Sequence, residues 1–131
     1  MGDAGALFLG VLISVLALRL NPDVDGKFTS FAIPVLLLAL PILDTSVAVL
    51  SRIKRGISPF QGGRDHLSHR LMRRGFTKRQ AAYSLWSLAG IFAAIAVTVA
   101  TSNTDSRFIV ALAIAFWIGL FLLFFNSEDT D

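Results

Sequence analysis

The residues whose types suit chemistry lie together in one basic segment, from Ser51 to Gln80. This segment holds nine of the twelve Lys and Arg residues of the chain and a single acid, Asp65. Both histidines, His66 and His69, lie there three residues apart in the run DHLSHRL. Arg and His side chains donate hydrogen bonds to phosphate oxygens, so phosphate chemistry is the first hypothesis for this segment.

The spacing within the segment also allows a plainer interpretation. If residues 65–74 form a helix, four side chains fall at i, i+3, i+4 and i+7 and make one cationic stripe: His66, His69, Arg70 and Arg73. Leu67 and Leu71 then fall on another face, where we expect them to rest on lipid. An amphipathic helix of this kind could simply attract anionic headgroups, at about 1 kcal/mol per cation. Two histidines are too few for a metal site without a third ligand nearby.

Two aspartates outside the segment are candidates for the same chemistry. Asp3 follows the initial Met-Gly, and Asp44 lies within an apolar run, six residues before Leu50. At 1.5 Å per residue, Asp44 lies about 9 Å inside the end of that run. An ionised carboxylate at that depth needs a polar cavity, a partner or water. A hydrogen bond to Thr45 or to an arginine of the basic segment is the alternative.

Composition predicts the class of protein that must position these residues. With 54% hydrophobic residues in 131 and a mean hydropathy of +0.67, the chain is expected to be an integral membrane protein. Its net charge of +3 comes from the basic segment, so we expect no nucleic-acid partner. The absence of cysteine excludes disulfides and thiolate metal sites.

The apolar runs predict an all-α domain over residues 1–131, with four transmembrane helices and a basic loop at residues 51–80. The predicted helices span residues 4–20, 31–50, 81–100 and 108–125. The first is expected to be a retained helix, because it has no basic start and no cleavage site typical of a signal peptide. Pro34 and Pro41 predict a kink in the second. Thr77 and Gln80 fit a capping box, with Gly75 ending the segment before it.

The charge distribution predicts how these helices are oriented. Nine cations in one short loop place that loop in the cytoplasm by the positive-inside rule, and four spans then place both termini there too. Asp3, Asp44 and the basic loop would therefore meet at one membrane surface. Carboxylates bind magnesium, while Arg and His bind phosphate, so the combination suits phosphate chemistry.

Three motifs also resemble a known family. MGDAGALFLG, PILDT and SPFQGGRDHLSHRL, in this order, are similar to the C-terminal third of the polyprenyl-phosphate N-acetylhexosamine-1-phosphate transferases of glycosyltransferase family 4. The resemblance implies transfer of a sugar 1-phosphate from a UDP-sugar, such as a UDP-N-acetylhexosamine, to undecaprenyl phosphate, with release of UMP. It implies a bacterial inner-membrane location, a role in starting envelope polysaccharides, and a Mg²⁺ cofactor.

The resemblance also implies roles for particular residues. Asp3 is expected to be a magnesium ligand or essential carboxylate, and His66 and His69 are expected to be catalytic residues that contact the donor phosphates. We assign phosphate binding to Arg64, Arg70 and Arg73, and regard Asp44 as a polar residue inside the membrane.

This sequence departs from the family in two ways. Ser68 stands where the family often has a third histidine. The paired aspartates and Asn-rich segment that the family places before the MGD motif are missing, so we expect a fragment that is inactive alone and needs an upstream half. The alternative is a non-catalytic four-helix membrane protein whose loop binds anionic lipid or a partner subunit.

Overall fold

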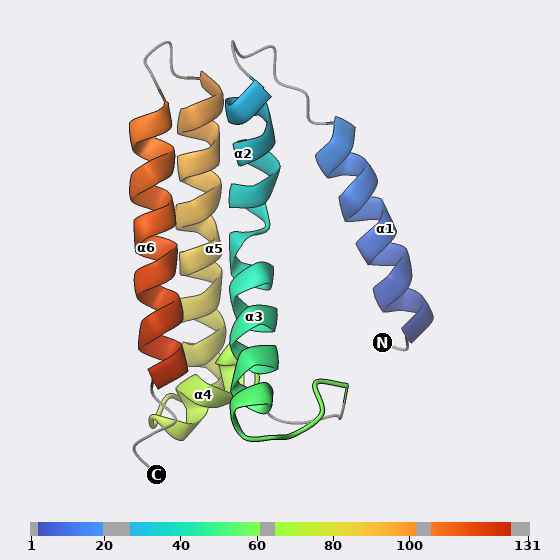
Figure 1. The fold of residues 1–131 in the computed structure, drawn as a ribbon, viewed down its shortest axis with the longest axis vertical. Coiled ribbons are helices and arrows are strands. Elements are labelled where there is room, and N and C mark those ends of the chain that lie inside the picture. The colour runs from blue at the N-terminus through green and yellow to red at the C-terminus, as the bar shows by residue number, and fades with distance from the viewer. Residues whose placement is uncertain (1–2, 20–26, 61–64, 102–105, 127–131) are drawn as a thin grey trace.

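The computed structural model describes residues 3–19, 27–60, 65–101 and 106–126, and within these ranges all regular structure is helical. The helices are α1 (Asp3–Arg19), α2 (Lys27–Leu37), α3 (Ala39–Lys54), α4 (Leu67–Arg73), α5 (Lys78–Thr101) and α6 (Arg107–Phe125). Figure 1 shows α2 and α3 as one bent column beside α5 and α6, with α4 lying across the lower end. The prediction of an all-α fold is confirmed.

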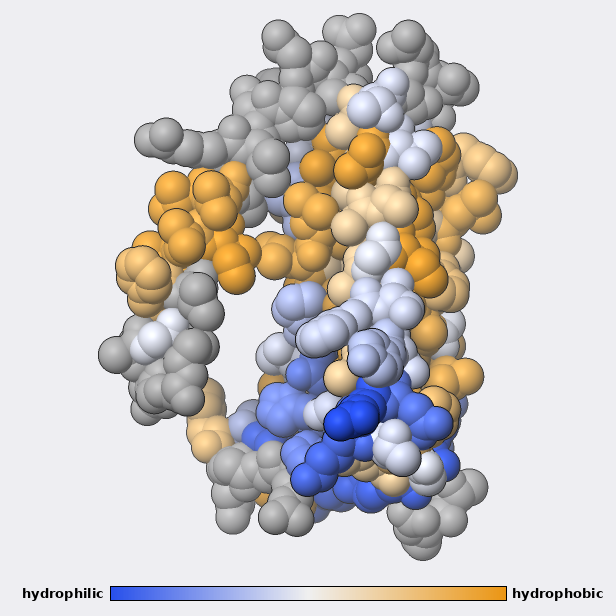
Figure 2. All heavy atoms as spheres, turned by 180° about the vertical axis from the view of Figure 1, so that it is seen from behind, coloured by the Kyte–Doolittle hydropathy of each residue, from blue (hydrophilic) through white to orange (hydrophobic). Residues whose placement is uncertain are grey.

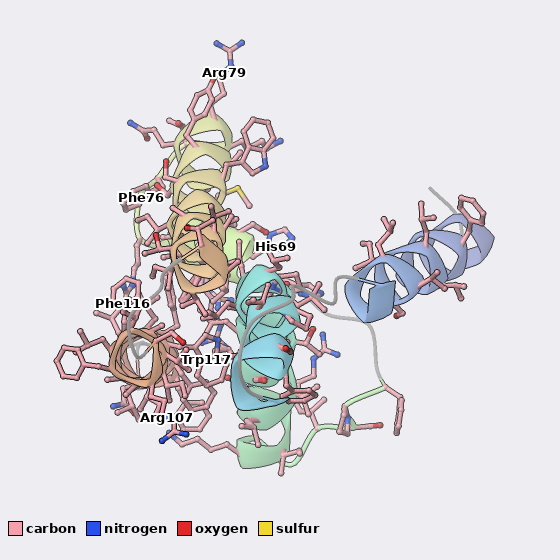
Figure 3. All side chains as sticks on the ribbon, turned by 90° about the horizontal axis from the view of Figure 1, so that it is seen from above. His69, Phe76, Arg79, Arg107, Phe116 and Trp117 are labelled. Carbon is pink, nitrogen blue, oxygen red and sulfur yellow. The ribbon has the colours of Figure 1, made fainter. Side chains whose placement is uncertain are left out.

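The column formed by α2 and α3 is bent by 63° at Leu38. Pro41 has no N–H to donate to the carbonyl of Leu37, and α2 ends at that residue. The indole N–H of Trp117 on α6 donates to the carbonyl of Ala39 at 2.9 Å, just past the break. Seen from above in Figure 3, Trp117 reaches from α6 toward this column. The predicted kink is therefore present, and a side chain from another helix is bonded to it.

Two described helices, α5 and α6, are long and apolar enough to cross a membrane. The bent pair of α2 and α3 adds a third if it is one broken span. In its described part α1 has 17 residues, about 26 Å, which is slightly short of the bilayer core, and it stands apart from the other helices in Figure 1. The protein is thus membrane-embedded, and the count of four spans stays a prediction.

The helices pack through two apolar clusters, one on each side of the bend. The first joins α2, α5 and α6 through residues that include Leu36, Phe92 and Val99. It borders an apolar cavity of about 220 Å³ lined in part by Val35 and Trp117. The second joins the lower parts of α3, α5 and α6 to α4, so α4 is packed into the bundle.

Leu67 and Leu71 belong to the second cluster, which corrects the expectation that they rest on lipid. Their exposed fractions are 1% and 7%. They pack with Leu43, Val47 and Phe124, among others. The pattern of the sequence gives α4 an apolar face, but it does not say that the ends of three longer helices cover that face.

Candidate functional site

The predicted site residues whose side chains the structure describes lie at the lower end of the bundle, around α4. Figure 2 shows the hydrophilic surface concentrated at this end, with apolar surface along the helices above it. Two glycines shape the chain here. Gly56 follows α3 with φ of 69°, and Gly75 follows α4 with φ of 94°. At each helix end the residue after the glycine donates back to the helix, Ile57 to Arg52 and Phe76 to Leu71, as in a Schellman motif.

The start of α5 has the capping box that the sequence predicts. The N–H of Thr77 donates to the side-chain oxygen of Gln80 at 2.9 Å, and the N–H of Gln80 donates to the hydroxyl of Thr77 at 3.3 Å. Only four residues separate the end of α4 from the start of α5. These local signals therefore fix both ends of the short connection that joins the site to the bundle.

Asp44 and His66, 22 residues apart in sequence, are in direct contact. One carboxylate oxygen of Asp44 lies 2.8 Å from Nδ1 of His66, and the other accepts a hydrogen bond from the N–H of Leu67. His66 itself precedes α4 and makes no side-chain cap bond. Asp44 thus takes the capping role from a different helix. The sequence left open whether Asp44 faces a cavity, water or a partner, or bonds to Thr45 or an arginine. In the structure it has two partners, the ring of His66 and the backbone N–H of Leu67.

The side chain of Arg70 is 2% exposed, so the expected stripe of four exposed groups does not form. Its guanidinium donates to the carbonyl of Asp65 at 2.9 Å, to the hydroxyl of Ser51 at 2.6 Å and to the carbonyl of Phe124 at 2.9 Å. Phe124 lies in the last turn of α6, whose final carbonyls have no helical donor. Arg70 therefore connects α3, α4 and the end of α6.

Asp65 is also engaged inside the protein. Its carboxylate pairs with Arg52, in the last turn of α3, at 2.8 Å and with Arg55, the residue after that helix, at 2.7 Å. Burial by itself would raise the pKa of Asp65, but the hydrogen bonds and charges of Arg55 and Arg52 outweigh it and hold the pKa below its usual value. Arg52 donates in addition to the carbonyl of Pro59 at 2.9 Å. These bonds hold the connection between α3 and α4 against α3.

The remaining predicted residues are placed as follows. His69 is half-buried on α4 and, in the view of Figure 3, lies between α5 and the column of α2 and α3. Arg73 is exposed at the end of α4. Asp3 begins α1, but its side chain lies outside the described residues, as does all of Arg64.

The described residues do not make a metal site by themselves. Among them no group of three His, Asp or Glu side chains is close enough to hold an ion. The carboxylates of Asp44 and Asp65 are already bonded to protein donors. The sequence alone did not predict the partners of Arg52, Arg55 and Arg70. The one signal for them was that Asp65 is the single acid among nine cations, which favours an ion pair with some of these cations.

Comparison with known proteins finds several similar transferases. The chain is 33% identical over 125 residues to the undecaprenyl-phosphate alpha-N-acetylglucosaminyl 1-phosphate transferase of Salmonella typhi, covering 93% of this chain and 32% of the relative. It is 31% identical over 124 residues to the probable undecaprenyl-phosphate N-acetylglucosaminyl 1-phosphate transferase of Bacillus subtilis, covering 95% of this chain and 31% of the relative. These matches confirm the resemblance to the polyprenyl-phosphate N-acetylhexosamine-1-phosphate transferases.

The match extends through the last two helices, which the motifs alone did not cover. The chain spans about a third of the length of the curated relatives it matches. No family model matches the chain, and no solved structure matches it.

Proposed function

We propose that this chain forms the phosphate-handling part of an enzyme that transfers N-acetylhexosamine 1-phosphate from a UDP-sugar to undecaprenyl phosphate. The observation that carries the proposal is the match along 93% of the chain to a transferase named for that lipid and that sugar phosphate. The proposed location is the inner membrane of a bacterium, with the basic loop and both termini in the cytoplasm, where the product would start an envelope polysaccharide.

The reaction joins two anionic substrates, which explains the use of a cationic site. An oxygen of the lipid phosphate bonds to the sugar-bearing phosphorus of the donor. The bond from that phosphorus to the bridging oxygen breaks, and UMP leaves with the electron pair. His66, His69 and Arg73 are proposed to donate to the phosphate oxygens and to stabilise the charge that builds up between them. Arg64 is proposed to assist, whereas Arg70 acts mainly by holding α4 in place.

Mg²⁺ remains part of the proposal through Asp3 alone. Asp44 and Asp65 are bonded to protein donors, so the described part of this chain supplies no second carboxylate for the ion. We therefore assign no step of the reaction to the metal. The upstream half predicted from the missing aspartate motifs would have to supply its other ligands.

The proposal is tested in a chimera, in which this chain replaces the matching third of the Bacillus subtilis relative. Membranes with the chimera are expected to convert labelled UDP-N-acetylglucosamine to a labelled undecaprenyl lipid. His69→Ala is expected to lower the rate about 100-fold, since a group acting on the reacting phosphates typically contributes 10²–10⁴. Thr98→Ala, an exposed change in the last turn of α5, far from the site, is the matched control. An inactive chimera that inserts normally would contradict the proposal.

A second candidate is the non-catalytic protein whose basic loop binds anionic lipid. It is favoured by two contacts that place cations at the end of α6, Lys54 over Phe125 at 5.3 Å and Arg74 over Phe124 at 5.8 Å. In that case the strength of lipid binding depends only on the total positive charge of the basic loop. His69→Ala and Arg73→Lys would then leave vesicle binding unchanged, and the chimera would make no product.

A further inference from the structure

Asp44 uses both of its carboxylate oxygens on the residues where α4 begins. One oxygen accepts from the N–H of Leu67, and the other lies 2.8 Å from Nδ1 of His66. The side chain of Asp44 is 32% exposed and that of His66 is 52% exposed. The carboxylate is therefore bonded inward, while the imidazole keeps a large surface open to a ligand.

The contact fixes which ring nitrogen carries the proton. A carboxylate only accepts hydrogen bonds, so the nitrogen next to it, Nδ1, must be the donor. In neutral His66 the other nitrogen, Nε2, then holds the lone pair, and in the protonated ring it is the second donor. Carboxylates orient metal-bound and catalytic histidines in the same way, through the nitrogen that does not react.

Capping of α4 does not account for this arrangement. A cap needs one acceptor oxygen for one free N–H, and the bond to Leu67 supplies it. The second oxygen of Asp44 reaches His66, a residue that the sequence places in the basic segment. The two bonds are thus separate, and one substitution can keep the first while reversing the second.

We propose that Asp44 is a positioning residue, which holds the Nδ1–H of His66 so that Nε2 is the nitrogen that faces the diphosphate of the donor and donates to it when the ring is protonated. This inference deepens the proposed function and rests on it for the identity of the ligand. Asp44 would touch no substrate, and its effect would pass entirely through His66.

Asp44→Asn is the informative variant. Its amide oxygen still accepts from Leu67, but its NH₂ group would face Nδ1 of His66 and turn that nitrogen into an acceptor. The proton would then move to Nε2. Asp65→Asn is the matched control, because it removes the carboxylate of the residue next to His66 in sequence, which does not contact the imidazole ring of His66.

The first measurement is the ¹⁵N NMR spectrum of the full chain in lipid nanodiscs, above the pH at which histidine is charged. The chain has only two histidines, so His69→Gln leaves His66 as the single signal. We expect the Nδ1–H form in this background and the Nε2–H form after Asp44→Asn, with no change after Asp65→Asn. An Nε2–H ring in the presence of Asp44 would overturn the inference, whatever the chimera does.

The second measurement is activity of the chimera. Asp44→Asn is expected to lower kcat about 10–100-fold, as loss of an orienting partner commonly does, with a smaller change in KM. In a His66→Ala background the same change is expected to have no further effect. Additive losses of activity in the double variant would overturn the positioning role of Asp44. A chimera that is inactive without any substitution would instead count against the proposed function, and the NMR result would still stand.

Discussion

At the residue scale, the basic segment contains two kinds of cation. Arg52 and Arg70 are buried and bonded to the protein, while Arg73 and its neighbours at the end of α4 are exposed. The buried guanidiniums donate to backbone carbonyls, to the hydroxyl of Ser51 and to the carboxylate of Asp65. Among the described residues, exposed Arg73 and the two histidines are the predicted site residues that can face a ligand, so the described binding surface is smaller than the charge of the segment suggests.

Arg70 is expected to be required for stability. Arg70→Lys cannot keep three bonds in three directions, because an ammonium lacks the planar fork of the guanidinium. Losing two bonds to a buried charge costs about 3 kcal/mol or more, at about 1.5–3 kcal/mol each. Arg73→Lys, on the exposed side of the same helix, is expected to cost less than about 0.5 kcal/mol. Unfolding of the two variants in detergent compares them, and equal stability would contradict the placement of Arg70.

Asp65 gives the lower end of the bundle a pH dependence. The pKa of Asp65 is lowered, so its ion pairs contribute stability that is complete above the unfolded-state value of about 3.9. That contribution is lost as the pH falls through the lower pKa of the folded protein. The unfolding temperature is expected to stay level down to about pH 4 and then to fall, by less in Asp65→Asn than in the original chain. A parallel fall in both proteins would contradict these ion pairs.

At the element scale, α4 is held from outside itself. It has seven residues, fewer than an isolated helix needs, and its stability comes from packing and from partners on other helices. Asp44 caps its first turn, and its apolar side packs against α3, α5 and α6. The two histidines are therefore placed by the bundle and not by the local sequence.

The capping box of α5 is expected to contribute measurably. Thr77→Ala removes the hydroxyl that accepts from Gln80 and should cost about 1 kcal/mol. Thr98→Ala removes a hydroxyl that only bonds back to Ala94 within the same helix, and it should be nearly neutral. Hydrogen exchange of the first turn of α5 measures the difference. Equal protection in both variants would contradict the capping role of Thr77.

The elements that the sequence predicted correctly are those with local causes. Pro41 breaks the column of α2 and α3, Gly75 follows α4, and Thr77 pairs with Gln80, all within a few residues of the chain. The pairing of Asp44 with His66 spans 22 residues, and Arg70 bonds across 54 residues to Phe124. No periodicity encodes such partners, because they depend on which helices come to lie side by side.

At the scale of the whole molecule, the basic end and the opposite end are predicted to lie on different sides of the membrane. The chain has no cysteine, so single cysteines report their side directly. Ser58→Cys, in the exposed connection after α3, should react with an impermeant thiol reagent only after the membrane is opened. Thr101→Cys, at the far end of α5, should react in intact cells. The reverse pattern would contradict the predicted orientation.

The most direct test of the central claim is the identity of the nucleotide that the chimera releases. Transfer of a sugar 1-phosphate must release UMP and leave both the sugar and one donor phosphate on the lipid. With UDP-N-acetylglucosamine labelled in both phosphates, we predict labelled UMP and a labelled lipid diphosphate in equal amounts. Release of UDP, or a lipid that carries sugar without the donor phosphate, would contradict the account.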